Sequence, residues 1–187
     1  MAFFDLTTLS LGDVVVSGKG SKSAPILSNG GQAVALLEPM GVVWEPSAFG
    51  NEDATRVNIV FRPSPALLAG LQAFDEWVIA TLAADSVRYF GRVKSAEQLR
   101  DAYVPAAKHS EKYPATFKAK MNLQDPNVVK VWDAEKRPRA QPQQWKDCLV
   151  VPRIRLRGLY FMGASFGPVI ELLDAQILGE ESPECPF

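Results

Sequence analysis

The stretch CLVVPRIRLRG, from Cys148 to Gly158, decides the fold of the chain because arginine recurs at every second position of its later half. Ile154 and Leu156 separate Arg153, Arg155 and Arg157, and this two-residue period is typical of a β-strand. On a strand the three guanidinium groups project from one face at intervals of about 6–7 Å. Arginine binds phosphate in a bidentate manner and also stacks on flat rings. The stretch predicts either a phosphate-binding strand or an ordinary solvated face.

The flanking sequence predicts further strands. Residues 147–178 favour three strands in succession, with turns near Gly158 and in 163–168. RVNIVFR, from Arg56 to Arg62, alternates apolar and polar residues in the same way. Further strands are expected in three places: QAVALLE and GVVWE (32–38 and 41–45), YPATFKAKMNL (113–123), and 128–132.

Helices and loops complete the pattern. Ser64-Pro65 is a helix start signal, and the apolar spacing that follows predicts a helix over 65–83, with a shorter helix over 95–103. The Gly- and Ser-rich segment 17–31 predicts a flexible loop, as does the polar segment 134–144. The fold class is therefore mainly β, an antiparallel domain with one or two inserted α-helices.

Charge is distributed unevenly along a chain whose formal net charge is −1. Residues 1–85 carry a net charge of −5, residues 86–157 carry +9, and residues 158–187 carry −5. A basic centre of this kind indicates an anionic partner for the middle of the chain.

Aromatic residues are interleaved with this charge, as in proteins that bind a single nucleic-acid strand through a basic groove with aromatic stacking platforms. The cationic candidates beside the three arginines are Lys118, Lys120 and Lys130. The aromatic candidates expected on the exposed side are Trp132, Trp145 and Tyr89, followed by Tyr113. The alternative for each aromatic side chain is a place in the core.

The chain ends in EESPECPF, in which Glu180, Glu181 and Glu184 precede a terminal Pro186-Phe187. This ending resembles the acidic tip of bacterial and phage single-stranded-DNA-binding proteins. In that family the tip recruits replication and repair enzymes and competes with DNA for the basic groove. The alternative is a frayed acidic terminus.

Two further stretches, KYPATFKAKM (112–121) and LYFMGASFGPVIELLDAQI (159–177), resemble segments of the OB-fold single-stranded-DNA-binding proteins of phages and large DNA viruses. The resemblance implies an OB-like five-stranded antiparallel barrel over residues 1–178, followed by an acidic tail over 179–187. It also implies binding of single-stranded DNA in replication, recombination or repair, with partner enzymes recruited by the tail. No catalysis and no cofactor are implied. The expected location is the cytoplasm of a bacterial host for a phage protein, or the nucleus or virus factory for a eukaryotic virus.

Other functions are also compatible with the sequence. The basic face could bind an acidic protein, as in an interaction module or a phage-encoded inhibitor, and the chain could form a symmetric dimer. Gly163-Ala164-Ser165-Phe166-Gly167 matches a serine-hydrolase motif, but the single histidine, His109, precedes it, and a β-turn is the better interpretation. Ser17–Ser21 lacks the residues of a phosphate loop. Asp75 and Glu76 predict a solvated helix face rather than an acid/base pair.

Composition excludes other classes. The two cysteines and one histidine offer no metal site. No uninterrupted apolar run approaches the length of a membrane span, and the N-terminus lacks the basic region of a secretory signal.

Overall fold

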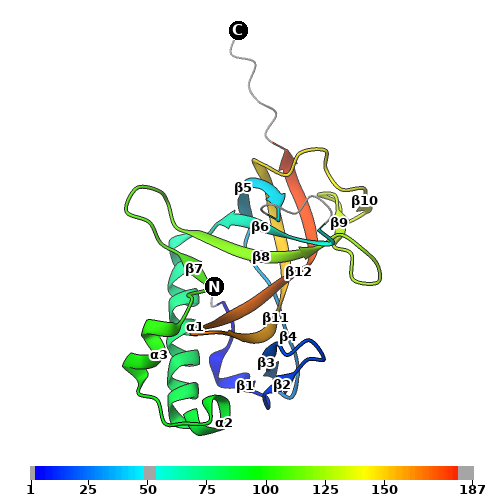
Figure 1. The fold of residues 1–187 in the computed structure, drawn as a ribbon. Helices are drawn as coiled ribbons and strands as arrows, with labels where there is room; N and C mark the ends of the chain where they lie inside the picture. The colour runs from blue at the N-terminus through cyan, green and yellow to red at the C-terminus, as the bar shows by residue number, and fades with distance from the viewer. Residues whose placement is uncertain (1–2, 49–53, 181–187) are drawn as a thin grey trace. The chain divides into compact units, whose positions relative to one another are not determined.

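The computed structural model describes residues 3–48 and 54–180, and Figure 1 shows the course of the chain. The chain divides into two compact units, each assembled from three segments. The first unit consists of Met1–Val34, Pro65–Lys108 and Leu156–Ile170, and the second of Ala35–Ser64, His109–Arg155 and Glu171–Phe187.

The second unit contains a closed ring of five strands. They are β5 (Met40–Ser47), β6 (Arg56–Arg62), β8 (Thr116–Asn122), and the parts of β11 (Cys148–Met162) and β12 (Ser165–Glu180) that belong to this unit. Their order is β11-β5-β6-β8-β12, and β11 also pairs with β12, which closes the ring. This is a barrel of the OB type, as expected. It is not wholly antiparallel, because β8 and β12 run parallel.

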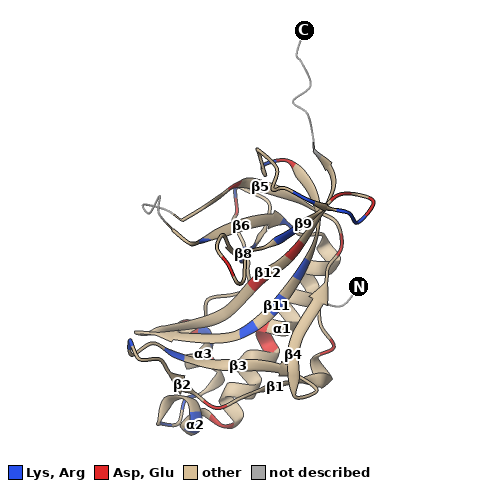
Figure 2. Ribbon diagram, turned by 90° about the vertical axis from the view of Figure 1, so that its right-hand side faces the viewer, with Lys and Arg blue, Asp and Glu red and all other residues tan. Residues whose placement is uncertain are grey.

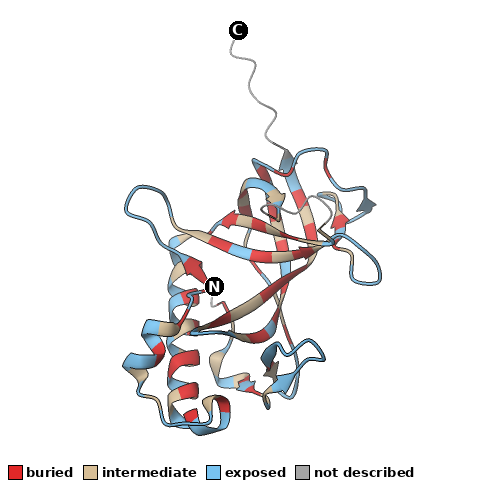
Figure 3. Cartoon of the chain, in the orientation of Figure 1, coloured by how far each residue is buried: buried red, intermediate tan, exposed pale blue. Residues whose placement is uncertain are grey.

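The barrel core follows from the alternation along its strands, which Figure 3 shows as buried and more exposed bands. Val57, Ile59 and Phe61 on β6 are opposite Met121, Ala119 and Phe117 on β8, respectively. All six are buried, and the Phe61 and Phe117 rings stack with centroids 6.1 Å apart. Burying one such large side chain contributes about 1.5–3 kcal/mol. The opposite face of these two strands is left for polar residues.

Two short strands extend the sheet of this unit beyond the ring. Strand β9 (Lys130–Trp132) pairs in parallel with β12, and β10 (Pro138–Arg139) pairs with β9. Strand β10 interrupts the loop predicted over 134–144.

The first unit combines small strands with helices. Its strands are β1 (Leu9–Leu11), β2 (Val15–Val16), β3 (Lys22–Ser28), the start of β4 (Gly31–Leu36), β7 (Ala107–Lys108) and the remaining parts of β11 and β12; a 3-10 turn, η1, covers Leu6–Thr8. Its helices are α1 (Pro65–Ala84), α2 (Ser86–Phe90) and α3 (Ala96–Ala102). Helices α1 and α3 confirm the predicted ones.

Helix α1 is long and apolar enough to cross a membrane by length and composition alone, although no single apolar run in it reaches that length. In the structure one stripe of it is buried, formed by Leu67, Leu71, Phe74, Val78, Ile79 and Leu82. A stripe of this kind is typical of a core helix.

Polar contacts join α1 to α3 and to the segment that follows it. The Asp75 carboxylate accepts hydrogen bonds from the Tyr103 hydroxyl at 2.6 Å and from the Ala106 amide at 3.1 Å. Glu76 pairs with Arg100 at 2.6 Å. Burial, followed by the adjacent Asp75 charge, raises the pKa of Tyr103 far above its ordinary value. The two carboxylates form no acid/base pair, but Asp75 is a structural acceptor rather than part of a solvated face.

One loop prediction and one strand prediction are wrong. Residues 17–31 are not a continuous loop, because they contain β3. Residues 147–178 form two long strands rather than three, with a tight turn at Gly163, whose φ is +58°. Gly158 lies inside β11, where a β-carbon would come within 2.3 Å of the Ala24 carbonyl oxygen on β3. This glycine permits a close approach of two strands instead of a turn.

Candidate nucleic-acid interface

The polar face of β6 and β8 carries a group of cations. In the antiparallel register Asn58 is opposite Lys120 and Val60 is opposite Lys118, while Arg56 is opposite Asn122. Since the alternate residues of both strands fill the barrel core, these side chains all project from the other face. Lys118 is exposed, and Arg56 and Lys120 are half-buried.

Glu171 on β12 holds two arginines on this face. It is only 1% exposed and is the register partner of Lys120 in the parallel pairing. Its Oε1 accepts from Arg56 Nη2 at 2.5 Å, and its Oε2 accepts from Arg155 Nε at 3.1 Å and Nη2 at 2.5 Å. The carboxylate therefore connects cations from β6 and β11 across the strands between them.

The electrostatic effect of this crowding is visible at Lys120. Partial burial, together with the nearby charges of Lys118 and Arg56, lowers the pKa of Lys120 below its ordinary value. Nearby like charges disfavour the charged form of an ionisable group. An anion placed on this face would relieve that repulsion.

A second carboxylate, Asp174, organises the neighbouring part of the face. Arg153 Nη1 donates to its Oδ2 at 2.6 Å, and the Trp132 indole N–H donates to its Oδ1 at 3.0 Å. Lys130 is the register partner of Asp174. Because Ala175 is buried whereas Leu173 and Asp174 are both half-exposed, the alternation of β12 slips here and turns Asp174 toward the charged face.

Two cavities of the second unit open among these residues. One of about 200 Å³ is lined by Lys130, Arg153, Arg155 and Asp174 together with Asn122, Pro126, Asn127, Val128 and Leu173. Another of about 340 Å³ is lined by Trp132, Arg153 and Asp174 together with Leu36, Lys136, Val151 and Gln176. The face is therefore hollowed where cations and an aromatic ring lie side by side.

The structure thus places six of the ten predicted side chains on this face of the second unit, namely Lys118, Lys120, Lys130, Trp132, Arg153 and Arg155. In Figure 2 the basic bands lie on β11 and the acidic bands on β12, the strand that pairs with it. The alternation of Arg153, Arg155 and Arg157 along β11 is confirmed by their burial pattern. Arg157 belongs to the segment of β11 in the first unit. Tyr113 is 73% exposed and precedes β8.

Two aromatic predictions are wrong in their exposure. Trp145 is only 5% exposed and Tyr89 only 8%, so both pack mainly against protein. Trp145 lies in a segment held by Glu45, whose carboxylate accepts from the Trp145 and Lys146 amides. The tail residues Glu181, Glu184, Pro186 and Phe187 lie outside the described residues, and Glu180 is described only as the last residue of β12.

Three residues of the face were not among the candidates. Arg56 lies on the polar side of the alternating segment RVNIVFR, and this position alone indicates that it shares a face with the other cations. Glu171 and Asp174 lie in an otherwise apolar run, and a hairpin centred at Gly163 would have brought them beside the arginines.

Ser165 is not a nucleophile of the hydrolase type. It follows a tight turn between two strands rather than a strand and a helix, and its hydroxyl donates to the Met162 carbonyl at 3.2 Å.

No protein-family model matches the sequence, and a search of curated proteins also finds no match. Solved structures do share the fold. The single-stranded DNA-binding protein from bacteriophage Enc34 in complex with ssDNA is similar with a TM-score of 0.55 and 13% identity, over 92% of this chain and 97% of that chain. Gp2.5, a single-stranded DNA-binding protein encoded by bacteriophage T7, is similar with a TM-score of 0.52 and 12% identity, over 81% of this chain and 88% of that chain.

The buried clamp on the barrel face can be tested by Glu171→Gln. Replacing the carboxylate by a neutral amide removes the negative charge that Arg56 and Arg155 share beside Lys120, which should lower the free energy of unfolding by about 3 kcal/mol. Urea denaturation followed by tryptophan fluorescence measures this loss.

The matched control is Asp13→Asn, which removes an ion pair of the same 2.5 Å length between exposed side chains, Asp13 and Arg88. Because solvent screens that pair, its loss should leave the unfolding midpoint nearly unchanged. Equal midpoints for the two variants would contradict the role given to Glu171.

Proposed function

We propose that this protein binds single-stranded DNA without strong sequence preference, through the barrel face of the second unit. The observation that carries the proposal is the clustering of Arg56, Lys118, Lys120, Lys130, Arg153 and Arg155 around two carboxylates and one half-buried tryptophan. Six cations against two carboxylates leave a surplus of positive charge on a hollowed surface.

The backbone of the strand supplies the main attraction. Lys118 and Lys130 are exposed, and their ammonium groups bind phosphates as point charges. On single strands each such contact contributes about 0.7 to the steepness with which log affinity falls with log salt. Arg153 and Arg155 are already oriented by their carboxylates, which reduces the entropy lost on binding. The Arg153 side chain is half exposed, so its guanidinium can also donate to a phosphate.

Stacking supplies the second attraction. The indole N–H of Trp132 bonds to Asp174, which fixes the ring beside the 340 Å³ cavity. A base has to leave a duplex stack before it can lie on such a ring, so the site favours single strands over duplex DNA.

The comparisons support this proposal at the level of fold. The Enc34 and T7 proteins are named as single-stranded DNA-binding proteins, and one Enc34 structure is a complex with ssDNA. Such a protein needs no catalytic group. We also propose that the protein acts in replication, recombination or repair, in the cytoplasm of a bacterial host. A homodimer is compatible with this function.

Salt-dependent titration with oligo-dT is the test of this function. The wild-type protein should bind oligo-dT more tightly than duplex of the same length, with affinity that falls steeply as salt rises. In Lys118→Gln/Lys130→Gln the slope of log affinity against log salt should become shallower by about 1.4, since two phosphate contacts are lost. Fluorescence anisotropy of a labelled oligonucleotide measures both quantities.

The matched control is Lys108→Gln/Lys146→Gln, which removes the same charge from exposed lysines that line neither of the two cavities of the second unit. Its slope should stay close to that of the wild type. Equal slopes for both double variants would exclude this face as the DNA site. Absence of any oligo-dT binding would favour the alternative, an acidic protein as the partner of the basic face.

The acidic terminus is proposed to recruit partner enzymes and to shield the basic face when DNA is absent. Deleting residues 180–187 removes three glutamates and the terminal Pro-Phe pair. The truncated chain should bind oligo-dT as tightly as the full chain or more tightly, because an intramolecular anion no longer competes, while binding to replication or repair enzymes should be lost. Weaker DNA binding after truncation would contradict this role.

A further inference from the structure

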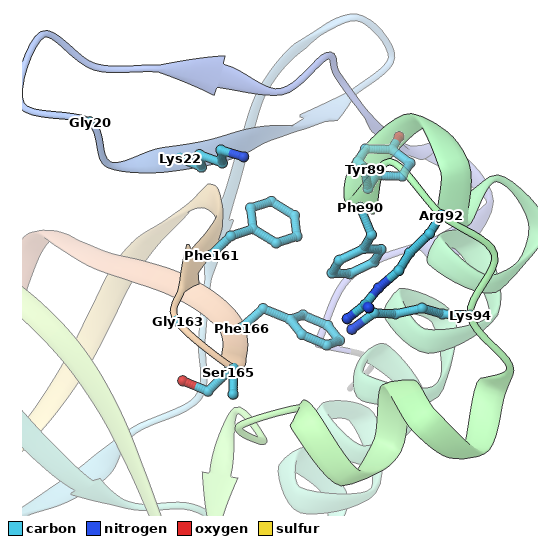
Figure 4. Close-up of a pocket in the computed structure, with 11 residues that line it drawn as sticks. Gly20, Lys22, Tyr89, Phe90, Arg92, Lys94, Phe161, Gly163, Ser165 and Phe166 are labelled. Carbon is cyan, nitrogen blue, oxygen red and sulfur yellow. The ribbon is translucent and has the colours of Figure 1, made fainter.

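The first unit contains a separate pocket that the barrel face does not use. Its volume is about 380 Å³, near the lower end of the range for small-molecule sites. The turn between β11 and β12, helix α2 with the residues after it, and the start of β3 enclose it (Figure 4). Its lining consists of Gly20, Lys22, Tyr89, Phe90, Arg92, Lys94, Phe161, Gly163, Ala164, Ser165 and Phe166.

Three phenylalanine rings form one wall. Phe161 and Phe166 stack with centroids 6.0 Å apart, and Phe90 meets each of them edge-on at 5.5 Å. Phe166 is 2% exposed and anchors the cluster, whereas Phe90 and Phe161 are half-exposed. Ring surface therefore remains open to the pocket, and its apolar area is available to a flat ligand.

Cations stand on both sides of these rings. Lys22, on β3, is the register partner of Phe161 on β11. Arg92 and Lys94 follow α2 on the opposite side of the rings (Figure 4). Lys94 Nζ lies 4.6 Å from the centroid of the Phe90 ring. None of the residues that line the pocket is Asp or Glu. The positive charge around the rings is therefore not balanced from within the pocket.

We infer that this pocket is a nucleotide subsite of the protein, which holds one unpaired base against Phe161 and Phe90 and the phosphates on either side of it against Lys22 and against Arg92 with Lys94. The inference rests on the proposed binding of single-stranded DNA and adds a contact region in the first unit. A nucleotide within a strand carries a phosphate on each side of its base, which matches cations on both sides of the rings. A peptide ending in an aromatic residue presents its terminal carboxylate on one side only.

Photocrosslinking locates the subsite directly. Oligo-dT carrying 5-iododeoxyuridine should crosslink to peptides that contain Phe161 or Phe90, as identified by mass spectrometry. In Lys22→Gln/Arg92→Gln these crosslinks should be lost, and the salt slope of oligo-dT binding should become shallower by about 1.4. Both replaced side chains are exposed, so the thermal midpoint should be unchanged.

A ring variant separates stacking from charge. Phe161→Leu keeps an apolar side chain of similar reach but removes the flat surface, and should weaken oligo-dT binding by at least about fivefold while leaving the salt slope unchanged. Lys108→Gln/Lys146→Gln serves again as the control of equal charge.

The outcomes separate this inference from the proposed function. If Lys118→Gln/Lys130→Gln weakens binding while Lys22→Gln/Arg92→Gln behaves like the control, the subsite is overturned and the barrel-face function stands. If the pocket variant loses binding to a synthetic peptide of sequence EESPECPF but keeps the wild-type slope with oligo-dT, the pocket is a peptide site and the inference is wrong. If the wild-type chain binds no oligo-dT at all, both fail together.

Discussion

The candidate site depends on one buried carboxylate. Glu171 is almost fully removed from solvent, yet it carries its charge next to Lys120 and receives hydrogen bonds from Arg56 and Arg155. Burying a carboxylate is costly unless cations and hydrogen bonds compensate for the lost water. Here the compensation comes from strands β6 and β11 at once, so the ion pairs also fix how these strands present their arginines. Without Glu171 the cations of this face would repel one another.

Asp174 repeats the arrangement on a smaller scale and adds an aromatic ring. It orients Arg153 and Trp132 together, so that a cation and a stacking surface share one cavity. The two carboxylates also account for part of the negative charge at the C-terminal end of the sequence. Residues 158–187 carry a net charge of −5, but two of the five acidic residues are Glu171 and Asp174, which belong to the basic face rather than to the tail.

Much of this architecture could be predicted from local patterns. The alternation in RVNIVFR and in PRIRLRG identifies the core and polar faces of β6 and β11, because a strand exposes alternate side chains whatever it pairs with. The spacing of Leu67, Leu71 and Phe74 identifies α1 for the same kind of reason. The candidate lysines of β8 and β9 follow from the same rule.

The remainder depends on contacts between distant residues. A glycine inside a strand is indistinguishable in sequence from a glycine at a turn. The place of Gly158 is set by its neighbour Ala24 on β3, which is more than a hundred residues away. With a turn placed there, the register that brings Arg155 to Glu171 could not be seen. Trp145 and Tyr89 were expected to be exposed because they adjoin lysine or arginine, but a neighbouring charge does not determine on which side an aromatic ring is buried.

Lysine footprinting tests the central claim, that the barrel face of the second unit contacts the nucleic acid. The protein is acetylated with a lysine-specific reagent with and without saturating oligo-dT, and the extent of modification is measured at each lysine by mass spectrometry. If the barrel face binds the strand, Lys118, Lys120 and Lys130 should be strongly protected, and Lys108 and Lys146 should not be protected. Equal modification of Lys118 and Lys130 in the free and bound protein would contradict it.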